Sequence, residues 1–524
     1  MNDKVKQSKL GPVAGVGRRV QVAGVVIGAL VVGLGYGLAK PAVAPAASAS
    51  SSAAQSTTTP VSSATVVCPM VKDSNSTDVS TFTPNTVPVS GSAAETVGQL
   101  QGGKSLLTAG KPGTLASAIN VSGASASAQD ISNPVVAKAS GPDAAGFTVT
   151  ETVPSGSLDS DKGLASENCG SPDTDFWFVG LGTDSSPFAM LNLANVESVA
   201  ATVTITMYTA GGEIGQSQAQ SLQGITVPAN SEQDELVNVL DTQSLGAPYA
   251  IHVVASAGRV GAAVLDWDGK GGGRDFVGAQ KSASKLVIPG IPQAENQEKV
   301  QLSLLSPDTA ASVALRWVGH STINPAQTGQ FSGNLVQGKV STVDLSTVPT
   351  AGEYAALEVC GANSAANQCL PVTGSAGAIP IVGGIKITQT GGGQDTAYTE
   401  PVQPLAGDGI VADDQPGSVL TLTNTGSSAA QVKLTETGTG AGPATSSSTV
   451  SVPAGQTVSS ALTAPKGASD FALTVTPLSG APDVYAARIE GTGSKISIQP
   501  LSSAAETVTI PAVGQDASGL VPQN

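Results

Sequence analysis

The feature that most constrains the fold of this chain is an internal repeat in its C-terminal two thirds. Three segments with alternating leucines, Leu191–Asn195, Leu302–Ser306 and Leu420–Asn424, begin 111 and 118 residues apart. Each is followed by a short turn, a pair of small residues and an alternating strand, at Ala200–Ile205, Ala310–Leu315 and Ala429–Leu434. A period of this length indicates that the fold is built from repeated structural units.

The match continues along each unit. The segment Val227–Asn230 corresponds to Val452–Gly455, although the middle unit lacks the proline. A further strand is expected in every unit, at Tyr249–Val253, Ala355–Val359 and Phe471–Val475. Each unit is also expected to close near an Ile-Pro pair, at Ile288-Pro289, Ile379-Pro380 and Ile510-Pro511.

The length and pattern of the units favour β-sandwiches. Units of about 110 residues with six or seven short alternating strands are typical of immunoglobulin-like sandwiches, in which one apolar face of each strand builds the core. We therefore predict an all-β chain of tandem immunoglobulin-like sandwiches. A β-propeller is the alternative, in which each unit would hold two or more blades. The expected domains are an N-terminal β-rich module at 66–172, repeats at 173–295, 296–400 and 401–515, and a flexible C-terminus at 516–524.

A second constraint is the uncharged apolar run Val20–Ala39, which follows Arg18 and Arg19. Twenty residues form about 30 Å of helix, the thickness of the hydrocarbon core of a bilayer. The basic tail at 1–19 predicts a cytoplasmic N-terminus and an extracellular body. The segment 40–65, rich in Ala, Ser, Thr and Pro, is expected to be a disordered stalk. The alternative is a protein secreted after cleavage at a small-residue site such as Ala42-Val43-Ala44.

The net charge of the chain limits the kinds of molecule that it can bind. Only 12% of the residues are charged, and the formal net charge is −15. Because residues 1–19 are basic, the remainder of the chain is more acidic than this total. An acidic body without a basic stripe argues against nucleic acid as a partner.

Four cysteines, all beyond the apolar run, predict two disulfides. Cys360 and Cys369 flank a turn-rich stretch between two apolar segments, so we expect them to close a hairpin. Cys68 and Cys169 then pair by elimination. Disulfides persist in oxidising compartments, which agrees with an extracellular body. No CxxC is present and the chain has two histidines, so zinc is a poor alternative.

One stretch resembles a known family. Gly163-Leu164-Ala165, Cys169 and the segment Asp175–Gly180 (DFWFVG) lead into the first Leu-x-Leu-x-Asn opening, downstream of an anchor and a small-residue stalk. This combination resembles a family of uncharacterised actinobacterial envelope proteins that carry a domain of unknown function (fifty-seven-nineteen). The resemblance implies an envelope location and a β-rich architecture, and it implies no activity for any residue of this chain.

Two acidic turns are the weak candidates for a metal site. Asp159 with Asp161, and Asp266 with Asp268, place carboxylates at alternate positions beside a glycine, as calcium loops do. Neither turn continues with a full ligand set, so ordinary polar turns are the simpler interpretation. Trp267 lies within the second turn and is expected to be exposed. With Arg274 nearby, Asp266, Trp267 and Asp268 therefore form the candidate binding loop.

No catalytic motif appears in the sequence. His252 is expected on the outer face of a strand and His320 in a turn, and no nucleophile elbow, HExxH or phosphate loop is present. We therefore expect a non-catalytic, membrane-anchored scaffold or interaction protein of the cell envelope, without cofactors. Its expected partners are the membrane, through Val20–Ala39, and envelope proteins or polysaccharide. An accessory role in binding or hydrolysing envelope polysaccharide, with acidic loops as the site, is the alternative.

Overall fold

The structure is a computed structural model of the whole chain. It describes residues 56–69, 77–84, 88–101, 114–119, 125–128, 133–154, 163–182, 187–214, 222–236, 248–268, 273–292, 298–320, 332–346, 353–362, 377–389, 395–439, 444–478, 483–491 and 495–510. The chain divides into two units, and almost all of these residues belong to the unit Thr58–Ile510. Within the described ranges no helix is long and apolar enough to cross a membrane. The expected anchor Val20–Ala39 and the C-terminus at 516–524 lie outside them. Of the stalk expected at 40–65, residues 40–55 also lie outside, whereas its end is ordered and enters the strands β1 (Thr57–Pro60) and β2 (Ser63–Cys68).

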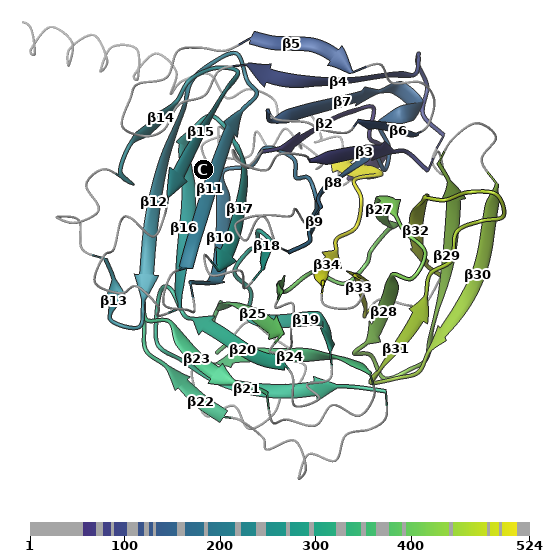
Figure 1. Cartoon of the computed structure of the whole chain (residues 1–524). Helices are drawn as coiled ribbons and strands as arrows, with labels where there is room; N and C mark the ends of the chain where they lie inside the picture. The colour runs from purple at the N-terminus through teal and green to yellow at the C-terminus, as the bar shows by residue number, and fades with distance from the viewer. Residues whose placement is uncertain are drawn as a thin grey trace, which may run out of the picture. The chain divides into compact units, whose positions relative to one another are not determined.

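The described part of the chain is almost entirely antiparallel β-sheet, as predicted. Its strands form eight four-stranded sheets, one of which carries a short additional strand, and one two-stranded sheet of β1 (Thr57–Pro60) with β35 (Thr507–Ile510). The helical element of these residues is the 3-10 turn η1 (Gly141–Asp143). Two four-stranded sheets, built from neighbouring strands of the chain, make one sandwich module. Four such modules follow one another along the chain (Figure 1).

The first two modules are named A and B. The strands of module A are β2 (Ser63–Cys68), β3 (Asp78–Phe82), β4 (Ala94–Gln101), β5 (Thr114–Ile119), β6 (Ser125–Ala128), β7 (Val135–Ser140), β8 (Thr148–Val153) and β9 (Ala165–Asn168). The strands of module B are β10 (Asp175–Leu181), β11 (Pro187–Asn195), β12 (Ala201–Thr209), β13 (Gly212–Glu213), β14 (Ile225–Val227), β15 (Ser231–Leu236), β16 (Tyr249–Ala257), β17 (Gly261–Asp268) and β18 (Arg274–Val277).

The last two modules are named C and D. The strands of module C are β19 (Lys285–Pro292), β20 (Glu298–Leu305), β21 (Ala311–Val318), β22 (Ser332–Leu335), β23 (Ser341–Asp344), β24 (Tyr354–Ala362), β25 (Val382–Gln389) and β26 (Thr396–Thr399). The strands of module D are β27 (Gly409–Asp414), β28 (Val419–Asn424), β29 (Ala430–Gly438), β30 (Thr445–Val452), β31 (Gln456–Ala461), β32 (Phe471–Pro477), β33 (Val484–Glu490) and β34 (Ser497–Leu501).

All four modules share one strand order. The first, sixth, third and fourth strands form one sheet, and the fifth, second, seventh and eighth form the other, as in β27-β32-β29-β30 with β31-β28-β33-β34. In module B, β14 takes the fourth place and the short β13 also pairs with β12. The sequence predicts three repeats behind an irregular N-terminal module; the sheets show that module A has the same topology as the three repeats.

The sequence repeat follows the strands closely, with one exception. The leucine segments form the second strands β11, β20 and β28, and the later matches form the third and sixth strands of each module. The expected closing Ile-Pro pairs are not equivalent: Ile288 and Pro289 lie in the first strand β19, whereas Ile379 and Pro380 precede the seventh strand β25. Because β19 pairs with β24, the strand pairing groups it with module C, although it precedes residue 296.

Buried asparagines explain the Leu-x-Leu-x-Asn signature. At the end of β11, the Asn195 amide donates to the carbonyls of Val199 and Val227, at 2.8 and 2.9 Å. At the equivalent end of β28, the Asn424 amide donates to the carbonyls of Ser428 and Val452, at 2.7 and 3.0 Å. Each asparagine therefore satisfies a buried carbonyl of the following strand and a part-buried carbonyl of the turn, which an apolar residue at this position would leave without the amide.

Each module has a core between its two sheets. In module B, Phe178 and Ile251 of one sheet are fully buried against Leu191 and Val264 of the other. Equivalent clusters fill modules A, C and D. Burial of the alternating apolar face is the main favourable term for such sandwiches. The predicted sandwich modules are thus present.

The four modules of the unit Thr58–Ile510 pack in a closed cycle. The first strand of each module contacts the second sheet of the next, with β2 on β17, β10 on β25, β19 on β33 and β27 back on β8. The eighth strands β9, β18, β26 and β34 contact one another in turn and lie innermost (Figure 1). The eight sheets therefore follow one another around a ring, as the blades of a propeller do. They differ from propeller blades because the strands of one sheet are not consecutive in the chain: the strands of the two sheets of a module are mixed in sequence.

Candidate functional site

The candidate binding loop is not a surface loop where its residues are described. Asp266 lies in β17 with 1% of its side chain exposed, and Arg274 lies in β18 with 5% exposed. The backbone of Trp267 pairs with that of Arg274 in the sheet, and the side chains of Trp267 and Asp268 lie outside the described part. Asp159 and Asp161 also lie outside it. The pattern of alternate carboxylates beside a glycine therefore does not mark a surface turn here, because the side chains of Asp266 and Arg274 are buried in the ring.

Asp266 joins module B to module C. The Tyr398 hydroxyl donates to Asp266 Oδ2, and the Lys386 ammonium lies 3.7 Å from the same oxygen. Both partners come from module C, on β25 and β26. All three side chains are almost fully buried. Burial and the Asp266 carboxylate hold the pKa of Tyr398 well above its usual value, so the phenol stays a hydrogen-bond donor. These contacts give Asp266 a structural role.

Asp275 connects the four innermost strands. Its carboxylate accepts the Ser497 hydroxyl of β34 at 2.9 Å and the backbone N–H of Tyr398 in β26 at 3.2 Å. The Ser497 hydroxyl in turn accepts the backbone N–H of Ser166 in β9 at 3.0 Å. Burial raises the pKa of Asp275 well above its usual value. One residue from each module thus meets at the ring centre.

The carboxyl group of Asp395 lies at the N-terminal ends of the inner strands, where backbone N–H groups bind it. It accepts the backbone N–H groups of Thr396, Leu164 and Ile496 at 2.9 to 3.2 Å, and burial raises its pKa to about 6. Gly273, at φ +87°, permits this approach because a Cβ there would lie 2.1 Å from the Asp395 carboxylate. The glycine next to Arg274 therefore serves close packing of modules B and C.

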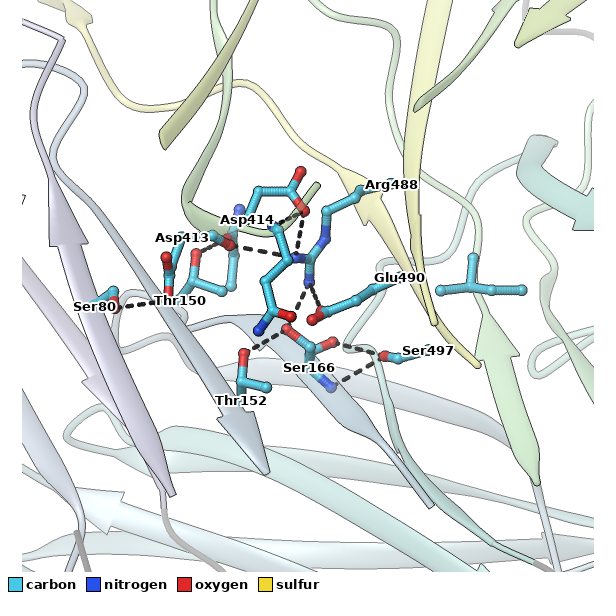
Figure 2. Close-up of polar contacts among 12 residues, drawn as sticks. Ser80, Thr150, Thr152, Ser166, Asp413, Asp414, Arg488, Glu490 and Ser497 are labelled. Carbon is cyan, nitrogen blue, oxygen red and sulfur yellow. Dashed lines mark hydrogen bonds and ion pairs between the residues drawn. The ribbon is translucent and has the colours of Figure 1, made fainter. Parts of the chain in front are cut away.

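Arg488 closes the ring between modules D and A (Figure 2). Its guanidinium, 1% exposed, pairs with Glu490 at 2.9 Å and Asp414 at 3.4 Å, both in module D. Its Nη2 also donates to the Ser166 hydroxyl of module A at 2.6 Å. Beside it, burial raises the pKa of Asp413 to about 7, and the Ser80 hydroxyl of module A donates to that carboxylate at 3.3 Å. The buried charges are thus paired within module D, and serine hydroxyls of module A bond to them across the last module contact.

A pocket opens at the carboxyl ends of these inner strands. It has a volume of about 250 Å³. The residues that line it are Pro69, Ser166, Glu167, Asn168, Cys169, Gly170, Ser171, Phe176, Ala262, Phe276, Gly278, Ala279, Glu400, Ile498, Gln499, Pro500 and Ser502. The lining comes from all four modules, and its described residues include carboxyls, amides and hydroxyls but no lysine, arginine or histidine. This central pocket is the candidate functional site.

Two carboxyl groups line the central pocket, and a third lies behind them. Glu167 faces Glu151 across the β8–β9 pair, where the two residues are direct register partners. Burial and the adjacent Glu151 carboxyl raise the pKa of Glu167 well above its usual value, and burial also raises that of Glu151. Burial raises the pKa of Glu400 to about 8, although the backbone N–H of Gly278 donates to it. Burial therefore favours the protonated form of each of these carboxyls.

Gln499 supplies an unpaired amide to the central pocket. Its side chain is 4% exposed, and neither Oε1 nor Nε2 has a hydrogen-bond partner. The neighbouring amide of Asn168 is by contrast satisfied, since it donates to the Ile410 carbonyl at 2.6 Å and accepts the Thr150 hydroxyl at 2.7 Å. A buried amide without partners costs about 1–3 kcal/mol for each unpaired group. Both amide atoms are themselves buried, so Gln499 leaves an unsatisfied amide within the wall of the central pocket.

The cysteines place a disulfide at the edge of the central pocket. Cys68 and Cys169 are bonded, as predicted, with their Cα atoms 4.8 Å apart. Cys360 is also in a disulfide, and its predicted partner Cys369 lies outside the described residues. Of the described side chains, Cys68, Glu151 and Cys169 are the one group close enough together for a metal ion. Because both thiols are in the disulfide, they are not available as thiolate ligands.

The histidines lie away from the central pocket. His252 of β16 stacks on Trp177, with ring centroids 3.9 Å apart, and its Nε2 lies 3.2 Å from the Asp175 carboxylate. Burial lowers the pKa of His252. His320 is exposed after β21. Both histidines are therefore structural or surface residues.

Sequence reasoning missed Glu151, Glu167, Glu400 and Gln499. None belongs to a recognisable motif, and the four come from three modules: β8 and β9 of module A, the segment after β26 of module C, and β34 of module D. One signal was available: in a chain with 12% charged residues, an acid inside an alternating strand such as Thr148–Val153 is unusual. The residue that lies opposite this acid in the neighbouring strand could not be predicted from local sequence.

Comparison with known proteins places the chain in a family. A search of curated proteins finds no match to this sequence. The model of a family described as "Family of unknown function (DUF5719)" matches residues 116–463, which run from module A into module D. That match covers well over half of the chain and includes the Asp175–Leu181 strand on which the resemblance was noted. The chain therefore belongs to this family of unknown function, DUF5719.

Proposed function

We propose that this protein is a non-catalytic binding protein of the cell envelope, whose central pocket holds a small polar ligand or one unit of an envelope polysaccharide. The observation that carries the proposal is the central pocket of about 250 Å³, which all four modules line and whose wall contains the partly exposed Glu167 and Glu400. A concave pocket with a few converging polar groups is the usual form of a small-molecule site. Protonated carboxyls both donate and accept hydrogen bonds, which suits a polar ligand.

The protonation of the central pocket favours binding over hydrolysis. Glycoside hydrolysis needs one carboxyl that is protonated and another that is ionised, so their pKa values must be separated. Here burial raises the pKa of Glu400 and of the Glu151–Glu167 pair in the same direction. Such carboxyls are suited to donating and accepting hydrogen bonds with a ligand.

The exposed faces give less support to an apolar docking surface. The large hydrophobic side chains that are exposed in the described part are Val199, Val336, Leu478, Val508 and Ile510. Apart from the pair on β35, they lie in different modules. Contiguous apolar patches mark protein interfaces, whereas single exposed residues are normal. We therefore place the binding function in the central pocket.

The proposed location is the outer side of the cell membrane, with Val20–Ala39 as the anchor and the modules outside. The Cys68–Cys169 disulfide supports this location, because such bonds persist in oxidising compartments. Protease treatment of intact cells is the test. We expect the modules to be degraded while an N-terminal tag is protected, and protection of the modules would contradict the proposal.

The binding function is tested by retention of polysaccharide. The full chain, purified in detergent, is immobilised and exposed to solubilised envelope polysaccharide from its host. We expect retention by the wild type and loss in Glu400→Leu, which removes a carboxyl group from the wall of the central pocket at similar volume. The matched control is Gln431→Leu, whose glutamine bonds to Ser451 on the outer strands of module D. Equal retention by wild type and Glu400→Leu would refute the central pocket as the site.

A further inference from the structure

A buried lysine lies at the contact between modules B and C. Lys386 of β25 is 4% exposed, and it is the one buried lysine among the described residues. Lysines are rarely buried unless they are paired. Here the partner is Asp266 of β17, whose Oδ2 lies 3.7 Å from the Lys386 ammonium. This distance is longer than a hydrogen bond, so the pair lacks the geometry that best offsets the burial of two charges.

The sheets hold the two side chains in place. The strand β17, which carries Asp266, lies between β11 and β18, and the strand β25, which carries Lys386, lies between β20 and β26. Both backbones are therefore hydrogen-bonded on two sides. Groups that a fold holds together react as if they were very concentrated, because the entropy of bringing them together has already been lost.

A hydrogen-bond donor acts on the same carboxylate oxygen. Tyr398 is the register partner of Lys386 in the neighbouring strand β26, and its hydroxyl donates to Asp266 Oδ2. The Lys386 nitrogen also lies 5.6 Å from the centroid of the Tyr398 ring. A donor to a carboxyl oxygen makes the carboxyl carbon more electrophilic and stabilises the charge that develops on that oxygen during acyl transfer. The three side chains thus combine a nucleophile, an acyl group and an acid.

We propose that Lys386 and Asp266 condense to an intramolecular isopeptide bond, which links module B covalently to module C. A proton passes from the ammonium to the carboxylate, and Lys386 Nζ then attacks Asp266 Cγ. The bond between Cγ and Oδ2 breaks. The oxygen leaves as water with two of the three ammonium protons, and the amide nitrogen keeps the third. The reaction needs no oxidant, reductant or other reactant.

Burial favours this product over the ion pair. Two charges in the protein interior carry a desolvation cost, whereas the amide is neutral. The side chains of Lys386 and Asp266 are 4% and 1% exposed, so the bulk water that hydrolyses amides is largely excluded. The pair of Lys281 with Asp173 is closer, at 2.8 Å, but its side chains are 54% and 48% exposed. Proximity is therefore common to both pairs, and burial beside a phenol distinguishes the first.

Peptide mapping by mass spectrometry tests the bond. The purified full chain is denatured, its disulfides are reduced, and it is digested with a protease. We expect a branched peptide that joins the segment containing Asp266 to the segment containing Lys386, and that is one water lighter than the two together. Lys386→Met should abolish this peptide, and the matched variant Lys281→Met should keep it. Tyr398→Phe should slow its appearance in freshly expressed protein by about tenfold or more.

The digest of the wild type decides the proposal even if a variant does not fold. Full recovery of Asp266 and Lys386 in separate, unmodified peptides would overturn it. A branch from Lys386 to a different acid would overturn Asp266 as the acyl group. An equal yield of branched peptide at Lys281 would show condensation during preparation and would also overturn the proposal. None of these outcomes depends on what the central pocket binds, so the bond and the proposed function are tested separately.

Discussion

Replacement of Arg488 by methionine tests whether the ring is closed by the contact between modules D and A. The guanidinium is buried, pairs with Glu490 and Asp414 of its own module, and donates to Ser166 of module A (Figure 2). Methionine keeps an unbranched side chain of similar length but removes the cation. The two carboxylates would then be buried without a positive partner, and Ser166 would lose its donor.

The expected cost is large because the pairs are buried. Removing one member of a buried ion pair typically costs about 3–5 kcal/mol, and loss of a hydrogen bond to a charged group about 1.5–3 kcal/mol. Because these effects overlap, we expect a loss of about 5 kcal/mol, a large share of the 5–15 kcal/mol that stabilises a typical domain. The loss should be concentrated at the closure, in β9, β33 and β34.

Hydrogen exchange followed by mass spectrometry provides the local readout. In Arg488→Met, backbone amides of β9 and β34 should exchange faster than those of β11 and β20, which lie in modules B and C. The matched control is Arg259→Met: that arginine pairs with Glu197 at 2.7 Å but is exposed, so its loss should cost no more than about 1 kcal/mol. Equal effects of the two substitutions, or uniform exchange throughout the ring, would refute the closure.

Three further predictions concern stability. Burial raises the pKa of Glu400 from 4.5 to about 8, so its contribution to stability is fully present below pH 4.5 and is lost as the pH rises to about 8, by up to about 1.4 kcal/mol per pH unit. The urea midpoint of the wild type should therefore fall between pH 5 and pH 8, and it should fall less in Glu400→Gln. A wild-type midpoint that rises over this range would contradict the prediction. Serine at both Cys68 and Cys169 opens a loop of sequence separation 101 and should cost about 4–5 kcal/mol in the chain-entropy model; an unchanged urea midpoint without reductant would argue against the bond. Asn424→Ala leaves two carbonyls unpaired and should cost about 1–3 kcal/mol, whereas no loss would show that water replaces the amide.

The repeat could be read from sequence because each module is locally consistent. Alternation in Ala200–Ile205 and its counterparts sets the buried face of the third strand, and the leucine segments set the second. Module A escaped the same analysis because no Leu-x-Leu opening marks its second strand, Asp78–Phe82. Strand order, by contrast, is a property of pairing between distant segments. Alternation alone does not show that the first strand of a module pairs with its sixth.

The central pocket could not be derived in the same way. Ser166 and Ser497, which meet at the ring centre, are 331 residues apart in the chain. Asp266 and Arg274 look locally like polar turn residues. Asp266 is paired only because module B packs on module C, and Arg274 donates to the Pro154 carbonyl of module A. Gln499 carries no local signal at all, since its significance comes from the absence of a partner after the four modules have met.

The measurement that tests the central claim most directly is a crystal structure of the full chain with a soluble fragment of envelope polysaccharide from its host. We predict one sugar unit in the central pocket, with its hydroxyls within hydrogen-bond distance of Glu167 and Glu400. Sugar bound only on the outer sheets, with the central pocket holding water alone, would contradict this claim.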